Sequence, residues 1–139
     1  MAVDGIFSQI RILITRLSLF LRRLIKKDKD KDLGRLGEDI AEQYLRSSGY
    51  KIIERNYSTF LGEIDIIACD KNTLCFIEVK SRRNTEKGHP IEAITPSKIQ
   101  RLRTLARLYL RDKNIDENEI ECRFDVVTIL KDRKNLKVE

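Results

Sequence analysis

The sequence has no tryptophan, one histidine and three cysteines among its 139 residues, and these shortages exclude several kinds of active site. A Ser-His-Asp triad or a histidine-rich metal centre would depend on His89 alone, which lies beside Pro90 in a loop-like segment. The cysteines (Cys69, Cys75 and Cys122) lack metal-ligand spacing and cannot all pair, so we expect reduced thiols and a cytoplasmic protein. Any chemistry must therefore come from carboxylates and lysines.

The sequence is rich in charged residues, with a surplus of basic ones. Charged residues make up 36% of the chain, hydrophobic residues make up 41%, and the formal net charge is +6. This length and composition suit one folded domain with its own core and exclude a disordered tail. The basic surplus suits a polyanionic partner such as nucleic acid or an anionic membrane surface.

Residues 1–32 differ in character from residues 33–139, and we expect them to form a separate unit of helix and linker. Residues 5–27 are predicted to form a basic amphipathic helix that leads into the charged linker KKDKDKD. Its apolar arc contains Ile6, Phe7, Ile10, Leu13, Ile14, Leu17, Phe20, Leu21, Leu24 and Ile25. Arg11 and Arg16 near its centre make membrane insertion unfavourable, and short apolar runs argue against a signal peptide.

This apolar arc needs a cover, which could be the core domain, a second copy or a membrane surface. Because the linker is strongly charged, we expect it to hold the helix away from the core. We therefore favour a homodimer formed through residues 6–25, with binding to a membrane surface as the second choice.

The rest of the chain, residues 33–139, predicts a mixed α/β domain. Helices are expected over residues 33–48, with Gly49 as the stop, and from Thr95 to about Lys113. Strands are expected over residues 50–57, 62–70, 74–81 and 121–130. The first three strands should form an antiparallel meander, and the fourth should return to the sheet after a crossover helix.

The hairpin over residues 61–81 contains the most informative pattern. A two-residue loop at Lys71-Asn72 would place Asp65 directly opposite Glu78, with their Cβ atoms about 5 Å apart. Period-two alternation then puts Glu63, Asp65, Glu78 and Lys80 on one face, and Ile64, Ile66, Ala68, Cys75, Ile77 and Val79 on the other.

Two carboxylates this close repel one another unless something neutralises them. Lys80 is one candidate, and Mg²⁺ or Mn²⁺, which prefer oxygen ligands, is the other. Such a group could hydrolyse a phosphodiester by in-line attack of water, with the lysine orienting the water or accepting its proton. A cross-strand acid-lysine pair on an exposed sheet face remains the alternative.

The stretch GEIDIIACDKNTLCFIEVKSR resembles the core of the PD-(D/E)xK nucleases, with Asp65, Glu78 and Lys80 in the Asp…Glu-x-Lys positions. From Gly34 to about Ile129 the chain resembles the YraN family of predicted bacterial endonucleases, which are similar to archaeal Holliday junction resolvases. The resemblance is carried by GRLGEDIAEQYL, RNY, GEIDII, FIEVKSR, the stretch 88–93, Lys98 and ARLYL.

The resemblance implies a restriction-endonuclease-like fold, with a mixed central sheet flanked by helices. It implies an Mg²⁺-dependent endodeoxyribonuclease in which Glu38 completes the catalytic set of Asp65, Glu78 and Lys80. It also implies that the Val79 carbonyl joins Asp65 and Glu78 as a metal ligand. From the residues alone, Glu38 could equally be a solvated acid in the first turns of its helix.

Basic residues follow the hairpin, with nine lysines or arginines and two acids between Lys80 and Arg111. We expect Arg82, Lys98, Arg103, Arg107 and Arg111 to bind nucleic acid, with Arg82 at the scissile region and Lys98 reaching toward the site from the apolar arc of its helix. Arg103, Arg107 and Arg111 form an i, i+4, i+8 stripe on that helix, which could follow the DNA phosphates. A solvated helix face is the alternative for that stripe. The function expected overall is an endonuclease acting on DNA, including branched DNA. The alternatives are a non-catalytic nucleic-acid-binding module of the same fold and an adaptor that acts through the N-terminal segment.

Overall fold

The computed structural model describes residues 10–13, 15–16, 33–82, 94–131 and 136–138. Two helices in these residues are α2 (Leu33–Ser47) and α3 (Pro96–Asp112). The strands are β1 (Ile10–Leu13), β2 (Thr15–Arg16), β3 (Lys51–Thr59), β4 (Gly62–Asp70), β5 (Thr73–Arg82), β6 (Glu121–Lys131) and β7 (Leu136–Val138). They form one mixed sheet in the order β2-β7-β6-β5-β4-β3, with β1 paired to β6.

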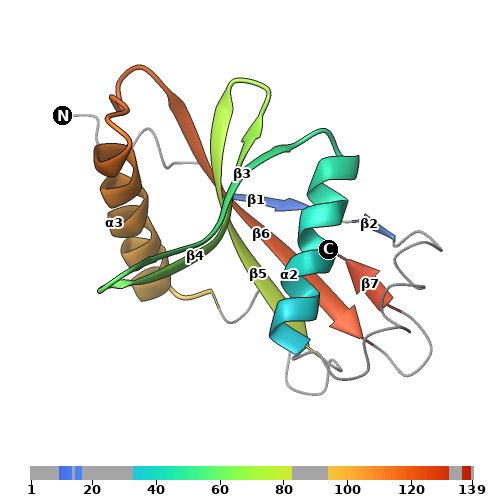
Figure 1. Cartoon of the computed structure of the whole chain (residues 1–139). Helices are drawn as coiled ribbons and strands as arrows, with labels where there is room; N and C mark the ends of the chain where they lie inside the picture. Colours follow the sequence, from blue (N-terminus) through green and yellow to red (C-terminus); the bar gives the residue numbers. More distant parts are fainter. Residues whose placement is uncertain (1–9, 14, 17–32, 83–93, 132–135, 139) are drawn as a thin grey trace.

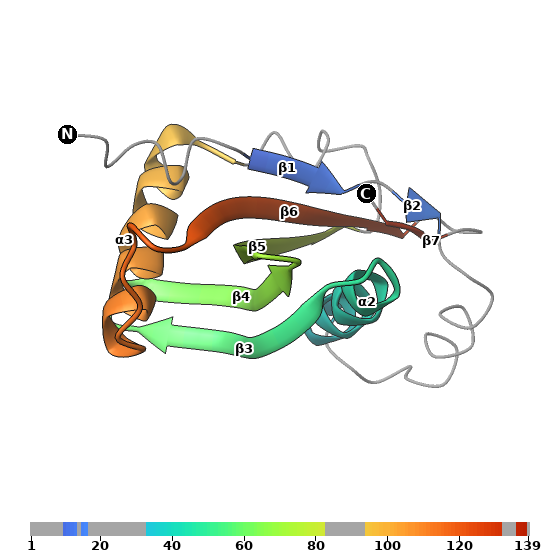
Figure 2. The same ribbon diagram turned by 90° about the horizontal axis from the view of Figure 1, so that it is seen from above.

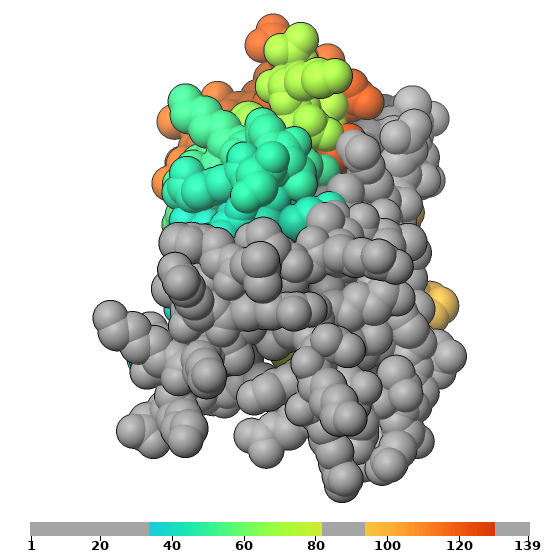
Figure 3. Space-filling view, turned by 90° about the vertical axis from the view of Figure 1, so that its right-hand side faces the viewer, coloured from blue at the N-terminus to red at the C-terminus, as the bar shows by residue number. Residues whose placement is uncertain are grey.

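The two helices pack on opposite faces of this sheet (Figures 1 and 2). One core joins α3 to the sheet through Leu102, Leu105, Ala106, Tyr109 and Leu110, which surround Phe76 and Phe124. The other joins α2 to the sheet through Leu36, Ile40, Ala41 and Leu45, which lie against Ile66, Cys75, Ile77 and Val127. The outer face of α2 stays on the molecular surface beside the β4–β5 hairpin (Figure 3). This arrangement is the predicted α/β core with a mixed central sheet flanked by helices.

Local sequence signals define the helix ends as predicted. Gly49, with φ 90°, follows α2, where the Tyr50 N–H bonds the Leu45 carbonyl and the Gly49 N–H bonds the Arg46 carbonyl. Helix α3 begins after Thr95, whose hydroxyl accepts a hydrogen bond from the Lys98 N–H. Because β5 and β6 are parallel, α3 is the crossover helix between them, as expected.

The predicted N-terminal helix is wrong at the residues that the structure describes there. Residues 10–13 form β1, which pairs in parallel with β6, and residues 15–16 form β2, which pairs with β7. The sequence Ile10-Arg11-Ile12 also has the alternation of a strand, and pairing with β6 satisfies its backbone groups. These residues therefore join the sheet instead of being held away from it. The rest of 5–27 and the linker lie outside the described residues.

Two further observations concern the ends of the domain. Strand β7, which pairs with the end of β6, was not predicted from the sequence. In the part of the chain that the structure describes, no helix is long and apolar enough to cross a membrane.

The β4–β5 hairpin has the predicted register, because Ile66 pairs with Ile77 and Asp70 with Thr73 around a turn at residues 71–72. The predicted apolar face is wrong at one position, since Ile64 packs in the α3 core while Ile66 packs in the α2 core. The alternation is broken at Asp65, opposite which β3 carries Asn56 with a φ of 54°. This left-handed residue lies between the pairs Arg55–Ile66 and Tyr57–Ile64 and twists the hairpin there.

Candidate metal and catalytic site

The candidate site lies where β4 and β5 separate. Pairing between these strands ends at Ile66–Ile77, whereas β4 remains paired to β3 and β5 remains paired to β6 as far as Arg82. Figure 1 shows the two strands diverging beyond this point. The Asp65 carboxylate accepts a hydrogen bond from the Val79 N–H at 2.7 Å. A side chain thus satisfies a backbone donor of β5 at the point where the ladder between these strands stops.

Three carboxylates gather at this point, and we call them the acidic cluster. One carboxylate oxygen from each of Glu38, Glu63 and Asp65 lies within 4.8 Å of the other two. Glu38 comes from α2, and the other two come from the start of β4. Burial and then the charge of Glu78 raise the pKa of Asp65 to about 7, against 3.8 for the free side chain, and the Val79 hydrogen bond only partly offsets them.

Glu78 faces two lysines that come from different elements. Its Oε1 lies 3.1 Å from the Lys80 Nζ on β5 and 2.7 Å from the Lys98 Nζ on α3. Burial lowers the pKa of Lys98, contact with Glu78 offsets part of this effect, and the neighbouring Lys80 adds to it. The buried Glu78, at 8% exposure, therefore holds a lysine pair of Lys80 and Lys98 next to the acidic cluster.

The donor atoms of the acidic cluster fit a hard divalent cation. Mg²⁺ binds oxygen at about 2.0–2.1 Å, so ligands on opposite sides of it are about 4 Å apart. The separations within 4.8 Å require only small side-chain movements to meet that geometry. A cation would also offset the burial and the neighbouring negative charge that raise the pKa of Asp65.

A second layer of polar side chains supports the acidic cluster. The Arg55 guanidinium bonds Asp39 at 2.8 Å, Glu42 at 2.7 Å and Glu38 at 3.4 Å. In the amide orientation that satisfies both of its polar atoms, Asn56 donates to Glu38 at 3.0 Å and to Glu63 at 2.9 Å. These contacts fix the carboxylate of Glu38 in place.

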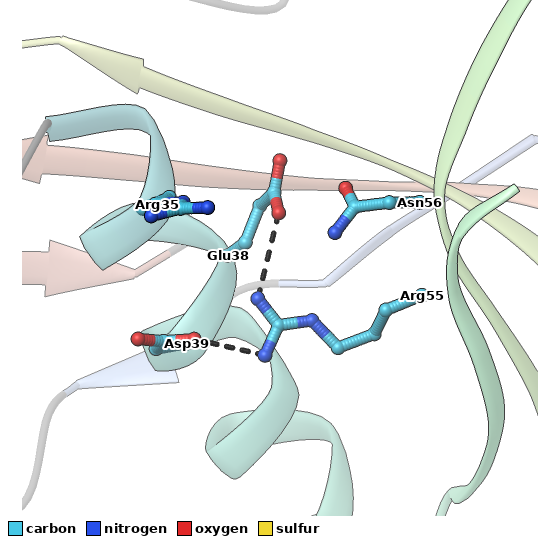
Figure 4. A pocket seen from close by; sticks show the side chains of 5 residues that line it. All are labelled: Arg35, Glu38, Asp39, Arg55 and Asn56. Atoms are coloured by element: carbon cyan, nitrogen blue, oxygen red, sulfur yellow. Dashed lines mark hydrogen bonds and ion pairs between the residues drawn. The ribbon is translucent and has the colours of Figure 1, made fainter. Parts of the chain in front are cut away.

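A polar cavity of about 330 Å³ opens beside this layer. Its lining residues are Arg35, Glu38, Asp39, Arg55 and Asn56. Figure 4 shows the Glu38 carboxylate pointing toward the Arg55 guanidinium and the Asn56 amide. Glu38, one member of the acidic cluster, therefore faces an open cavity between α2 and β3.

Gly37 brings α2 close enough to β5 for Glu38 to reach the cluster. A Cβ at this position would collide with the Ser81 hydroxyl and lie 3.2 Å from the Ser81 Cβ. Any side chain at this position would require Ser81 to move, and glycine avoids that movement.

The structure brings together five of the predicted site residues: Glu38, Asp65, Glu78, Lys80 and Lys98. Lys98 bonds Glu78 and thus reaches into the site, as expected from its place in the apolar arc of α3, whereas its binding to nucleic acid stays a prediction. Metal binding by the Val79 carbonyl stays a prediction, and the Val79 N–H is the donor to Asp65.

Glu63 and Asn56 were not assigned to the site from the sequence. Glu63 was placed on the same face as Asp65, and that placement was the available signal. Asn56 lies in the RNY motif, but its contacts depend on its left-handed backbone conformation, which the pattern does not reveal.

The predicted DNA-contacting arginines lie at different distances from this site. Arg103 and Arg107 are half-buried along α3, where the Arg107 Nε lies 3.9 Å from Glu117, and Arg111 is exposed in the last turn. Arg82 is the last residue of β5. Their contact with DNA stays a prediction.

Known proteins similar to this chain match it over about 70% of its length. Residues 37–129 match the sequence profile described as "Uncharacterised protein family UPF0102". The chain is similar to a UPF0102 protein of Chlorobium limicola, with 53% identity over 100 residues, 72% of this chain and 76% of the relative. It is also similar to UPF0102 proteins of Syntrophomonas wolfei, with 48% identity over 73% of this chain and 86% of the relative, and of Dictyoglomus turgidum, with 42% identity over 73% and 84%.

Proposed function

The chain belongs to the uncharacterised protein family UPF0102, and we propose that it is a divalent-metal-dependent endonuclease that hydrolyses phosphodiester bonds in DNA, including branched DNA. The observation that carries this proposal is the acidic cluster of Glu38, Glu63 and Asp65 next to the lysine pair on Glu78. Three oxygen donors beside two lysine side chains match the needs of a reaction at a phosphate.

Glu38, Glu63 and Asp65 are the side chains that would hold Mg²⁺ or Mn²⁺. The Val79 carbonyl and Glu78 remain further candidate ligands. When bound, the cation would neutralise charge on the phosphate and lower the pKa of a bound water. In its absence the cluster holds a proton near neutral pH, because the pKa of Asp65 is about 7.

The lysine pair supplies the acid-base part of the proposed reaction. Since burial and Lys80 lower the pKa of Lys98, its Nζ is the better proton acceptor of the two. The Lys98 Nζ first gives its proton to solvent, and the neutral amine then takes a proton from the attacking water as the water oxygen bonds to phosphorus. The bond from phosphorus to the leaving oxygen breaks, and that oxygen takes a proton from solvent. The Lys80 ammonium, which the charges of Glu78 and Asp65 favour, stabilises the negative charge on the phosphate.

The test is cleavage of labelled DNA with Mg²⁺ or Mn²⁺, using a continuous duplex and a four-way junction. Wild type is compared with Asp65→Asn and Lys98→Met, which remove a carboxylate charge and the proposed proton acceptor. The matched controls are Asp116→Asn and Lys51→Met, which change exposed residues of the same types away from the site.

We expect wild type and both controls to cleave at least one substrate and to stop when EDTA is added. Asp65→Asn and Lys98→Met should lower the rate at least 100-fold. Cleavage by Asp65→Asn at the wild-type rate would contradict the proposal. Metal-independent DNA binding without cleavage by wild type would favour a binding module.

A further inference from the structure

The turn between β3 and β4 presents an aromatic side chain almost entirely to solvent. Phe60 is 92% exposed and Leu61 is 39% exposed, and together they form the hairpin tip between Thr59 and Gly62. Among the large hydrophobic side chains that the structure describes, Phe60 is the most exposed. A single exposed hydrophobic side chain is common on protein surfaces, so the case for a contact at Phe60 depends on what surrounds this turn.

The hairpin tip is a tight and well-bonded turn. The Leu61 N–H donates to the Thr59 hydroxyl at 3.0 Å, and the strands close on the pair Thr59–Gly62. Gly62 has a φ of 140°, which a residue with a side chain rarely adopts. Phe60 therefore lies on a turn whose backbone conformation is already defined. Little backbone entropy would be lost when its ring contacts a ligand.

The hairpin tip is directly joined to the acidic cluster. The Ser58 hydroxyl donates to the Glu63 carboxylate at 3.0 Å, so the residue two positions before Phe60 contacts a member of the cluster. At about 3.4 Å per residue, Gly62, which ends this turn, is about 10 Å from Asp65 along β4, and Phe60 lies two residues before Gly62. Because nucleotides are about 3.4 Å apart along one strand of duplex DNA, this reach corresponds to a few nucleotides.

A cationic side chain from another element lies against the same turn. Arg101 of α3 is exposed, and a Cβ built on Gly62 would lie 3.8 Å from its Cδ and 3.9 Å from its Nε. Aromatic rings that stack on bases, next to cations that hold phosphates, are the combination found in sites for unpaired nucleic acid. Figure 2 shows the ends of β3 and β4 reaching α3, which places Arg101 and the hairpin tip together.

We infer that Phe60 stacks on an unpaired or unstacked base of the DNA that occupies the acidic cluster, and that Arg101 holds a phosphate beside that base. This inference rests on the proposed nuclease function and narrows its substrate class. The substrate is DNA with an accessible base a few nucleotides from the cleaved bond, such as a junction, a flap or a single-stranded end. A continuous duplex offers no open base face and gains nothing from the ring.

The experiment measures binding and base stacking with the full chain in EDTA, where the proposed cleavage does not proceed. Probes are a four-way junction, a single-stranded flap and a continuous duplex, each with 2-aminopurine near the branch or at the matching duplex position. Wild type is compared with Phe60→Ala, Phe60→Trp and Arg101→Ala. Ile53→Ala, which shortens another exposed hydrophobic side chain on β3, is the matched control.

We expect Phe60→Ala to bind the junction and the flap about 5- to 100-fold more weakly than wild type, with duplex binding unchanged. Phe60→Trp should restore the affinity, and Ile53→Ala should leave it unchanged. Wild type should quench the 2-aminopurine signal of branched probes, and Phe60→Ala should not. Arg101→Ala should weaken binding to all probes and lower the slope of log K against log salt by about one.

The outcomes separate this inference from the proposed function. If wild type binds and, with Mg²⁺, cleaves DNA while Phe60→Ala behaves as wild type on every probe, the stacking role is wrong and the nuclease proposal stands. If wild type neither binds nor cleaves any probe, both are wrong. If Phe60→Ala changes only the sedimentation of the free protein, the ring is a contact between copies and the stacking role is overturned.

Discussion

At the scale of single residues, Asp65 combines a structural function with an electrostatic cost. Its carboxylate bonds the Val79 N–H at 2.7 Å, yet burial and the charge of Glu78 raise its pKa to about 7. An asparagine can keep the hydrogen bond through its carbonyl oxygen and carries no charge. The charge of Asp65 therefore lowers the free energy of unfolding of the metal-free protein, and a bound cation would offset this cost.

The first prediction concerns the pH dependence of stability without metal. Between about pH 4 and pH 7 folded Asp65 holds a proton that the unfolded chain has lost, so the free energy of unfolding of wild type falls as pH rises through this range. Asp65→Asn has no carboxyl group at this position, so its free energy of unfolding does not include this fall. From pH 5 to pH 8, the stability of the variant relative to wild type should rise by about 1–3 kcal/mol.

Urea unfolding in EDTA at several pH values measures this difference, with Asp116→Asn as the control for loss of an exposed aspartate. A difference between Asp65→Asn and wild type that does not change with pH would show that Asp65 titrates normally.

The second prediction concerns Gly37. Alanine normally stabilises a helix by about 1 kcal/mol relative to glycine. Here a Cβ would collide with the Ser81 hydroxyl, so Gly37→Ala should destabilise the protein by about 1–3 kcal/mol. Thermal or urea unfolding should show that adding Ser81→Ala recovers most of the loss, relative to Ser81→Ala alone. A Gly37→Ala variant more stable than wild type would contradict the close packing of α2 on β5.

At the scale of elements, β6 connects the sheet through a buried ion-pair network. Arg123 bonds Asp125 at 2.7 and 2.9 Å, Asp70 at 2.9 Å and the Tyr50 hydroxyl at 3.0 Å. Asp125 is 1% exposed, and its second oxygen accepts from Tyr50 at 3.1 Å. These contacts tie β6 to β4 and to Tyr50, which lies between α2 and β3. They leave neither carboxylate oxygen of Asp125 dependent on water.

The third prediction is that Arg123→Met destabilises the protein by about 3–5 kcal/mol, because it leaves the buried charge of Asp125 without its partner. Arg111→Met, in the exposed last turn of α3, should change stability by less than about 0.5 kcal/mol. Urea unfolding of both variants at pH 7 makes the comparison. Equal stability of the two would mean that the network contributes little to the fold.

The fourth prediction concerns α3 and rests on the proposed function. If Arg103 and Arg107 contact DNA phosphates, replacing both with alanine should weaken binding to all sequences and lower the slope of log K against log salt by up to about two. Binding titrations at several salt concentrations measure the slope, with Arg46→Ala on α2 as control. An unchanged slope would show that Arg103 and Arg107 make no phosphate contacts and belong only to a solvated face of α3.

Most elements could be predicted because their signals are local. The apolar period of α2, the Thr95-Pro96 start of α3 and the turn at residues 71–72 each follow from neighbouring residues. Strand β1 was mistaken for helix because its isoleucines fit both a helical arc and a two-residue alternation. Its pairing with β6, more than 100 residues away along the chain, decides between them and is not visible in the sequence.

At the scale of the whole molecule, the site depends on how three separate parts of the chain meet. Period-two alternation predicted that Asp65, Glu78 and Lys80 share a region, and resemblance added Glu38. Neither could show that the acids group as Glu38, Glu63 and Asp65 while Glu78 pairs with lysines. That division follows from the separation of β4 and β5 and from the placement of α3, which are properties of the folded sheet.

Self-association through residues 6–25 also belongs to this scale and stays a prediction. Its premise of a free amphipathic helix is wrong at residues 10–13 and 15–16, which pair within the sheet. Sedimentation of the full chain measures the assembly state directly.

The central claim is that Glu38, Glu63 and Asp65 hold a divalent cation together, and Mn²⁺ titration followed by electron paramagnetic resonance tests it most directly. Wild type and Asp116→Asn should bind one Mn²⁺ with equal affinity, and Asp65→Asn and Glu63→Gln should each bind at least 10-fold more weakly, because each loses one carboxylate ligand. Equal affinity of wild type and both site variants, or no binding by wild type, would contradict the claim.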